Sequence, residues 1–320
     1  MNRHASIFHP PSASSTLEQP PSCETLISAP FNSVSWGQTV PSFELSSNDP
    51  AILARAEIIF RPWRCAQPGE PVRHWWVEQS DSHNGDSAGR WKIWSDASNE
   101  VSFGNTPGHA LMMVEFLAVE ALIEHPDGPL SLHGALVEKD GKGAVILGGG
   151  GAGKSTLACA LWQRGWTTLC DDTTLVEAEL ARAYPAPRRV SLRSPSRDLL
   201  GEELWARISA TPSCDRTSEG CLFHPDEVDL KRRSDSTPLA ALIFLGRRGS
   251  SAGSAKLERL EPAHALLALL PYSNIIRRVL PGEAIRRISP LADVVAAYDL
   301  GRGPLEEMVQ SVEQLLAQGD

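Results

Sequence analysis

Apolar and polar positions divide the chain into three stretches. Residues 1–27 are rich in serine, proline and threonine and contain few large apolar side chains, which predicts a disordered tail. Residues 28–108 contain short apolar or alternating runs separated by turn-forming residues, which predicts a small β-rich domain. Residues 109–320 mix apolar strand-like runs with segments of helical spacing. This last stretch is therefore predicted to be an α/β domain.

Three runs in the β-rich stretch are predicted to be strands, namely 56–61, 74–77 and 89–94. The segment 80–88 contains Asn-Gly-Asp and is predicted to be a turn or an exposed loop. The predicted strands carry four tryptophans: Trp75, Trp76, Trp91 and Trp94. These side chains either fill a small core or line a binding face, and the alternation of aromatic and polar positions favours the core.

The α/β stretch begins with a predicted helix over 110–124, whose apolar residues share one face. Further helices are predicted at 156–164, 262–270 and 304–317. Strands are predicted at 132–138, 144–147, 166–169, 174–177, 188–192 and 239–245, with a hairpin turn at 140–143. The run 239–245 is apolar throughout, as expected of a central strand. The polar segment 194–236 is predicted to be a long loop, either a lid or disordered chain.

The most informative motif lies between the strand at 144–147 and the helix at 156–164. It reads Gly-x-x-x-x-Gly-Lys-Ser, the complete phosphate-binding loop pattern. Its glycines allow backbone N–H groups to point at phosphate oxygens, and the N-terminus of the following helix adds a positive field. Lys154 is expected to reach the β- and γ-phosphates, and Ser155 to bind Mg²⁺. The predicted nucleotide-binding residues are Gly148, Gly149, Gly150, Gly151, Ala152, Gly153, Lys154, Ser155 and Thr156.

Three further residues are expected to converge on this loop. Asp171 and Asp172 end the strand that follows the helix, and His133 lies on the strand before the loop. Two carboxylates beside a triphosphate repel it, unless one holds Mg²⁺ and the other accepts a proton from an attacking hydroxyl. Crowding by negative charge raises the pKa of a carboxyl group and makes it a better base. His133 either orients an aspartate or is a structural hydrogen-bonding group.

Composition and charge argue against several classes of protein, namely nucleic-acid-binding, disulfide-rich, secreted and membrane-spanning proteins. The net charge of −9 argues against general affinity for nucleic acid or acidic lipid. None of the six cysteines forms a Cys-x-x-Cys pair, so neither a disulfide framework nor a zinc site is expected, which fits a reducing cytoplasm. The N-terminus contains no continuous apolar segment typical of a signal peptide, and the apolar stretch 110–123 carries two glutamates and is too short to cross a bilayer. A cytoplasmic protein without nucleic-acid or membrane partners is therefore expected.

The chain from Leu132 to Asp172 resembles the catalytic domain of the HPr kinase/phosphorylase family and its HPr-kinase-related members. The shared features are a His-Gly strand, the loop ending in Gly-Lys-Ser, an Arg-Gly turn after the helix and the Asp-Asp pair. The likeness is compact over about residues 130–178 and weaker as far as about 300. It implies a P-loop kinase domain with a fold related to phosphoenolpyruvate carboxykinase, behind an N-terminal β-rich domain.

The same resemblance implies an activity and roles for the site residues. The activity is transfer of phosphate from ATP, with Mg²⁺, to a serine of a protein or peptide. Asp172 is implied as the base, with His133 supporting the pair, while Ser155 and Asp171 hold the metal. A homo-oligomer is also implied, although the sequence contains no assembly signal.

The chain departs from the bifunctional members of that family in its front domain and in one sequence segment. Bifunctional members carry a segment reading roughly I-E-V-R-G-L-G, which supplies a metal-binding glutamate and accompanies phosphorylase activity. The corresponding region, 184–193, contains no such segment, so phosphorylase activity is not expected. Glu177 is a candidate replacement for the glutamate on spacing alone. Arg188, Arg189 and Arg193 either meet phosphate charge or are surface arginines.

Three functions are compatible with the sequence. The favoured one is a kinase acting on a serine of a protein or peptide. The second is a regulatory module that binds or slowly hydrolyses ATP or GTP without a phosphoacceptor, and the third is a kinase of a small alcohol such as free serine. An ABC transporter ATPase is disfavoured because no Leu-Ser-Gly-Gly-Gln-type signature follows the loop. A phosphoenolpyruvate carboxykinase is disfavoured because its metal-binding lysine and histidine set is not evident.

Overall fold

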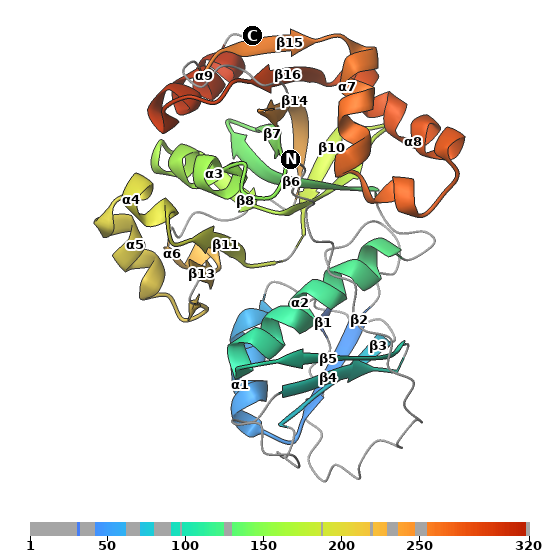
Figure 1. Ribbon diagram of the computed structural model, residues 1–320, viewed down its shortest axis with the longest axis vertical. Helices are drawn as coiled ribbons and strands as arrows, with labels where there is room; N and C mark the ends of the chain where they lie inside the picture. The colour runs from blue at the N-terminus through green and yellow to red at the C-terminus, as the bar shows by residue number, and fades with distance from the viewer. Residues whose placement is uncertain are drawn as a thin grey trace, which may run out of the picture.

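The computed structural model describes residues 31–32, 42–61, 71–79, 91–96, 98–124, 130–186, 188–217, 220–228, 236–246 and 255–317. Within these ranges the chain is a mixed α/β protein with three β-sheets. The smaller part of the molecule, with helices α1 and α2, lies below the larger part in Figure 1. The predicted tail at 1–27 and the predicted turn at 80–88 lie outside the described residues. In the described part of the chain, no helix is long and apolar enough to span a bilayer.

The first sheet belongs to the smaller part and has the strand order β1-β2-β3-β4-β5. Its strands are β1 (Phe31–Asn32), β2 (Ser42–Ser47), β3 (Pro71–Gln79), β4 (Trp91–Ser95) and β5 (Ser98–Gly104). Strands β3 and β4 confirm two of the predicted strands. Trp75 and Trp91 are buried in the core, as the alternation favours. Trp76 lies on the other face, where its ring stacks with the rings of His74 and Trp94.

Two helices pack on this sheet, α1 (Pro50–Ile59) and α2 (Pro107–Glu124). The prediction of a strand at 56–61 is wrong, because most of this run is the end of α1. Asp49 caps the helix by accepting a hydrogen bond from the backbone N–H of Ala51, and proline occupies its first turn. The buried residues of α1 are spaced by three or four positions, as in a helix: Ile52, Leu53, Ala56 and Ile59.

The large sheet has the order β10-β9-β6-β7-β14-β16-β15, and β8 also pairs with β6. Its strands are β6 (Leu130–Lys139), β7 (Lys142–Leu147), β8 (Thr167–Cys170), β9 (Thr173–Glu177), β10 (Arg182–Pro185), β14 (Thr237–Leu245), β15 (Leu257–Leu260) and β16 (Ala296–Leu300). The all-apolar β14 is central, between β7 and β16, as predicted. Strands β6 and β7 form the predicted hairpin.

Helices cover both faces of the large sheet (Figure 1). They are α3 (Lys154–Gln163) and α9 (Leu305–Ala317) on one face, and α7 (Pro262–Leu269) and α8 (Pro281–Val294) on the other. Alternate residues of β7 accordingly enter two cores, with Ile146 facing α3 and Val145 facing α8. Two 3₁₀ turns, η2 (Leu270–Tyr272) and η3 (Asn274–Arg277), connect α7 to α8.

A third sheet lies where the two parts of the molecule meet, and its order is β11-β13-β12. The region contains β11 (Val190–Arg193), α4 (Ser196–Leu200), α5 (Glu202–Ser209), β12 (Asp215–Arg216), β13 (Gly220–Phe223) and α6 (Pro225–Val228). The prediction that 194–236 is a long loop is therefore wrong for its described residues. These elements are short and pack into the core that also contains α3 and α9, where α5 buries Leu204 and Ile208 one turn apart.

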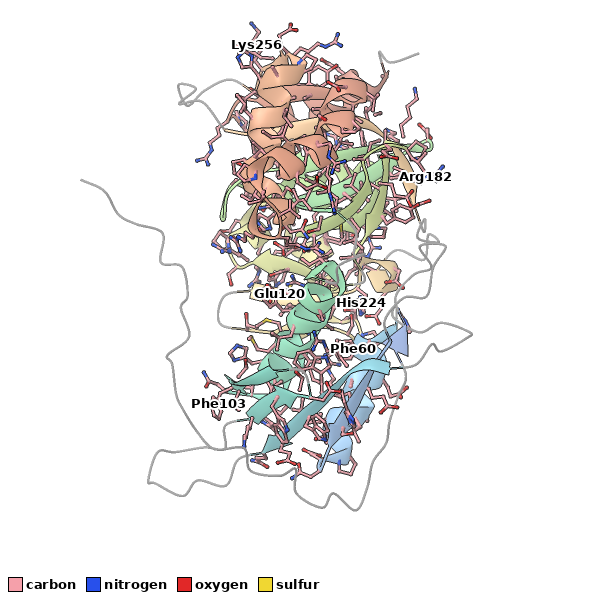
Figure 2. All side chains as sticks on the ribbon, turned by 90° about the vertical axis from the view of Figure 1, so that its right-hand side faces the viewer. Phe60, Phe103, Glu120, Arg182, His224 and Lys256 are labelled. Atoms are coloured by element: carbon pink, nitrogen blue, oxygen red, sulfur yellow. The ribbon has the colours of Figure 1, made fainter. Side chains whose placement is uncertain are left out.

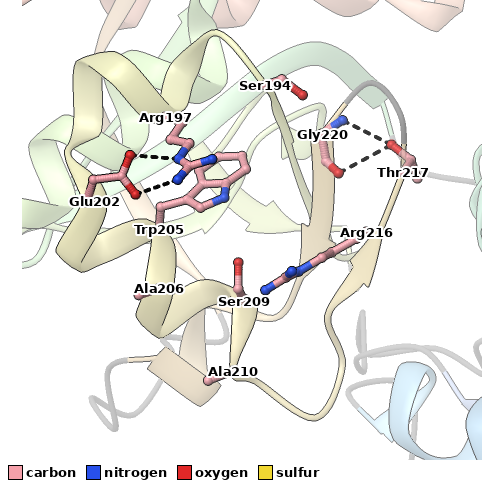
Figure 3. Close-up of a pocket in the computed structure, with 10 residues that line it drawn as sticks. All are labelled: Ser194, Arg197, Glu202, Trp205, Ala206, Ser209, Ala210, Arg216, Thr217 and Gly220. Carbon is pink, nitrogen blue, oxygen red and sulfur yellow. Dashed lines mark hydrogen bonds and ion pairs between the residues drawn. The ribbon is translucent and has the colours of Figure 1, made fainter.

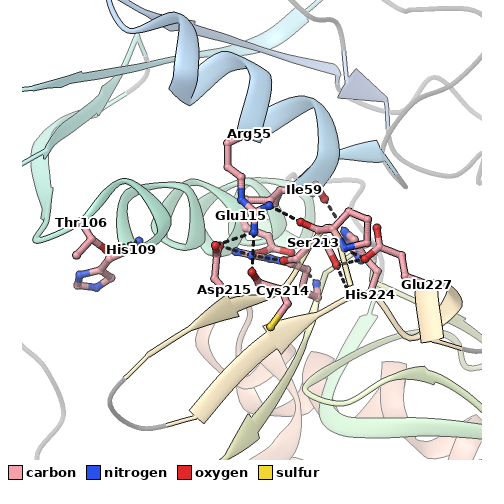
Figure 4. Close-up of polar contacts among 12 residues, drawn as sticks. Arg55, Ile59, Thr106, His109, Glu115, Ser213, Cys214, Asp215, His224 and Glu227 are labelled. Carbon is pink, nitrogen blue, oxygen red and sulfur yellow. Dashed lines mark hydrogen bonds and ion pairs between the residues drawn. The ribbon is translucent and has the colours of Figure 1, made fainter. Parts of the chain in front are cut away.

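Charged side chains join the two parts (Figure 4). Arg189 is fully buried, and its Nε donates to Glu115 on α2 at 3.1 Å. Its Nη1 donates to Asp215, which also accepts from Arg55 on α1 at 2.7 Å. His224, which lies close to the level of Glu120 in Figure 2, donates from Nε2 to the carbonyl oxygen of Ile59 at 2.7 Å.

Candidate functional site

The glycine-rich loop 148–153 connects β7 to α3, as predicted. Gly151 and Gly153 have φ values of 75° and 98°, in the left-handed region that favours glycine. Lys154 is buried, and its ammonium group donates to the carbonyl oxygens of Gly148 at 2.8 Å and Gly149 at 3.4 Å. Burial lowers the pKa of Lys154. The loop therefore holds the Lys154 ammonium group at the N-terminus of α3. Both the ammonium charge and the helix N-terminus attract anions.

Asp171 lies behind the loop, against Ser155. Its Oδ2 accepts hydrogen bonds from the Ser155 hydroxyl at 3.0 Å and from the backbone N–H of Ser191 at 2.8 Å. Burial, and then the negative charge of Asp172, raise the pKa of Asp171 to about 6. A hydroxyl and a buried carboxylate at this distance are oxygen ligands of the kind that Mg²⁺ prefers. The pair therefore fits a magnesium ion that binds with a nucleotide.

Other protein ligands for a metal are few. Within the described ranges, no group of three or more histidine, cysteine, aspartate or glutamate side chains could hold a metal ion. A cation on Ser155 and Asp171 would take its remaining ligands from phosphate and water, as is usual for Mg²⁺. Glu177, the candidate replacement ligand, is the last residue of β9, whereas Asp172 precedes the first residue of that strand. The Glu177 carboxylate accepts a hydrogen bond from the Tyr184 hydroxyl at 2.9 Å.

A row of polar contacts connects Lys154 to Asp172 through His133. The Lys154 ammonium lies 3.1 Å from Nε2 of His133, whose Nδ1 lies 3.2 Å from Oδ1 of Asp172. Burial is the main cause that lowers the pKa of His133. We assign the neutral ring, in which Nε2 accepts from Lys154 and Nδ1–H donates to Asp172. His133 thus contacts both Lys154 and Asp172, and its role in orienting the carboxylate stays a prediction.

Strand pairing places His133 at the loop. Strand β6 runs antiparallel to β7 and pairs Gly134 with Leu147, the last residue before the loop. The backbone N–H of Gly134 donates to the carbonyl oxygen of Asp172 at 2.9 Å. A Cβ atom at position 134 would lie 2.9 Å from the carbonyl oxygen of Ile146, closer than real contacts of this kind. Glycine next to His133 therefore allows the close approach that brings these strands together.

Two arginines complete the site, and the sequence left open whether they meet phosphate or lie on the surface. Arg188 Nη1 lies 3.0 Å from Oδ2 of Asp172, and its guanidinium lies 5.6 Å from the ring centre of Phe116 on α2. Arg193 Nη1 would lie 3.8 Å from a Cβ placed on Gly151, so it is at the edge of the loop. The cluster of arginines after β10 is the sequence feature that could have indicated these site residues. Spacing alone, however, does not distinguish Arg188 and Arg193 from Arg189, which is structural.

Thr156, the last predicted nucleotide-binding residue, lies on α3 with its hydroxyl 2.8 Å from the Ser196 hydroxyl on α4. A cavity of about 320 Å³ opens beside the carboxylate pair and is lined by Asp172, His133 and Arg188. A separate cavity of about 490 Å³ lies between α5 and β13 (Figure 3). None of its lining residues belongs to the loop or to the carboxylate pair, so it is outside the candidate site.

Comparison with known proteins matched one family model and a set of solved structures. The family described as SynChlorMet cassette protein ScmC matches residues 103–189, just over a quarter of the chain. This span begins in β5 and ends at Arg189, so it includes α2, the loop and both aspartates. No curated protein matches. Among solved structures, the HPr(Ser) kinase/phosphatase from Coxiella burnetii is 14% identical and matches 59% of this chain and 99% of its own, with a TM-score of 0.31. At this TM-score the relationship is distant.

Proposed function

We propose that this protein is an ATP-dependent kinase that transfers the γ-phosphoryl group to a serine hydroxyl of a protein or peptide. One observation carries the proposal: two adjacent aspartates have separate environments. Asp171 is buried against Ser155, whereas Asp172 is about one-third exposed and borders a cavity. Such a division suits one carboxylate to hold a metal and the other to accept a proton.

In this proposal the loop and Lys154 bind the phosphates, while Ser155 and Asp171 hold Mg²⁺. The magnesium ion, when bound, would neutralise charge on the phosphates. Asp172 accepts the proton of the attacking hydroxyl, whose oxygen forms a bond to the γ-phosphorus. The bond from that phosphorus to the β–γ bridging oxygen breaks, and its electron pair leaves with ADP. His133 and Arg188 hold one carboxylate oxygen each, which fixes the direction of the base.

The first test identifies the product. Purified protein is incubated with γ-labelled ATP, Mg²⁺ and a lysate of the source cell, and products are resolved by mass. We expect a labelled protein or peptide that is absent with Lys154→Ala and present with Arg286→Ala, an exposed basic residue on α8. A labelled small alcohol would support the free-serine alternative. Release of phosphate alone would contradict the kinase and favour the regulatory ATPase.

A further inference from the structure

The cavity beside Asp172 is formed by three segments that are distant in sequence. Helix α2 contributes Phe116 and Glu120, the site itself contributes Asp172, and the segment after α7 contributes Arg277 and Arg278. Its volume of about 320 Å³ is at the small end of ligand-binding cavities. A cavity of this size accommodates one residue and part of its neighbour. It therefore suits a short extended segment or a single small molecule.

Hydrogen bonds fix the arginine segment against the other two walls. The side-chain oxygen of Asn274, in η3, accepts from the backbone N–H of Ser131 on β6 at 3.0 Å. The side-chain nitrogen of Asn274 donates to the carbonyl oxygen of Ile123 on α2 at 3.3 Å. One residue of η3 thus connects the strand that carries His133 to the helix that carries Phe116. Arg277 and Arg278 follow on this fixed turn, so their position relative to Asp172 is built into the fold.

The charges of this cavity favour an anionic occupant. Arg188 is engaged with Asp172, whereas Arg277 is exposed and lies on the same cavity. Arg278 is half-buried and also lines it. A guanidinium group matches a carboxylate with two parallel hydrogen bonds. Glu120 is the other acidic residue of the lining besides Asp172. Phe116, 39% exposed, supplies an apolar wall.

We propose that this cavity is the acceptor site and that Arg277 and Arg278 select a hydroxyl substrate with a carboxylate close to the reacting hydroxyl. The proposal rests on the kinase function above and narrows its substrate class. The shared chemistry, a serine hydroxyl near a carboxylate, is present in a peptide with aspartate beside serine and in free serine.

Binding, measured separately from turnover, tests the proposal. Two fluorescein-labelled peptides with amidated C-termini, Ala-Ser-Asp-Ala and Ala-Ser-Asn-Ala, are titrated with the full chain, Mg²⁺ and a non-hydrolysable ATP analogue, and anisotropy is recorded. We expect the aspartate peptide to bind about tenfold more tightly, as one charge-assisted pair provides. Arg277→Gln should reduce this preference, and Arg277→Glu should abolish or reverse it. Arg259→Glu, the same change at an exposed position of β15, should preserve it.

A second variant separates selectivity from general binding. Phe116→Ala should weaken both peptides and leave their ratio unchanged. If free L-serine displaces the aspartate peptide, the substrate is the free amino acid. If it does not, the substrate is a peptide with aspartate beside serine.

Equal binding of the two peptides, no binding of either, or a preference that survives Arg277→Glu would each overturn the proposal. Phosphate transfer is measured in parallel with ATP. A preserved preference without transfer to peptide or to serine would contradict the kinase function and leave the carboxylate site standing.

Discussion

At the scale of single residues, the site divides its charges between a buried and an accessible aspartate. Asp171 is 4% exposed, and its pKa is raised to about 6, mainly by burial. Desolvation lowers the pKa values of the buried Lys154 and of His133, whose side chain is 45% exposed. In the protein without ligand, the environment of each of these three side chains therefore favours the neutral form over the charged form. Bound phosphates and Mg²⁺ would supply the missing countercharges.

Asp171 should make stability depend on pH when Mg²⁺ is absent. Its pKa is about 6 in the folded chain and about 3.9 in an unfolded one. The folded state therefore prefers the protonated carboxyl group, and its stability falls as pH rises from about 4 to about 6. We expect Asp171→Asn to increase the free energy of unfolding by about 2 to 3 kcal/mol at pH 7.5, and by much less at pH 4.

Urea unfolding in EDTA at the two pH values measures this difference. When Mg²⁺ and ATP replace EDTA, the wild type should become more stable than Asp171→Asn, because only the wild type retains the metal-binding carboxylate. An advantage for Asp171→Asn that is the same at both pH values would contradict the account of this residue.

At the scale of elements, the hairpin of β6 and β7 is the frame of the site. It places His133 beside the end of β7 and depends on a close approach at Gly134. We expect Gly134→Ala to destabilise the protein by about 2 kcal/mol, since an added methyl group must displace a backbone carbonyl. Transfer activity should also be lost, because His133 and Asp172 would move.

Gly282 on α8 provides the control for this substitution. A Cβ atom at this position would meet nothing within 4 Å, so Gly282→Ala should leave stability unchanged or slightly increased. Thermal unfolding and a transfer assay on both variants test the prediction. A Gly134→Ala variant with normal activity would contradict it.

The elements also show what the sequence could predict. Long apolar runs and capped or Gly-bounded segments predicted β6, β7, α3 and the central β14 correctly, because their pattern is sustained and local. The run 56–61 was ambiguous because a short apolar stretch fits a strand or the end of a helix, and the cap at Asp49 decides it. The short elements within 194–228 gave little periodic signal, since their stability comes from contacts with distant segments.

The same distinction applies to the site. The loop, His133 and the two aspartates are close in sequence, and the structure brings them together as expected. Arg188, its partner ring Phe116 and the arginines after η3 come from separate segments, so only the folded chain places them together. Whether the front domain ends at residue 108 stays a prediction, although α2 packs on the first sheet and also lines the site.

At the scale of the whole molecule, the segment 188–191 links the junction of the two parts to the site. Arg189 pairs with Glu115 and Asp215 at the junction, while Arg188 holds Asp172 and the Ser191 N–H holds Asp171. We therefore expect a change in the position of α2 on the larger part to shift both carboxylates, because residues 188, 189 and 191 lie on one short segment.

Glu115→Gln should test this link. It leaves Arg189 buried with one carboxylate partner instead of two, and we expect a loss of about 3 kcal/mol in the free energy of unfolding. Turnover should fall as well, because Arg188 and Ser191 move with Arg189. Glu313→Gln removes a partly exposed pair with Lys139 and should cost less than about 1 kcal/mol. Wild-type turnover in a folded Glu115→Gln variant would show that the junction is only structural.

The most direct test of the proposed kinase compares turnover with ATP affinity in Asp172→Asn. The amide keeps the size of the side chain but cannot accept the proton, so kcat should fall by about 10² to 10⁴. The Kd for ATP with Mg²⁺ should stay within about threefold, since the loop, Lys154 and Ser155 are intact. Asp293→Asn, an exposed aspartate on α8, should change neither value. Normal turnover in Asp172→Asn would contradict the assignment of Asp172 as the base and, with it, the division of roles between the two aspartates.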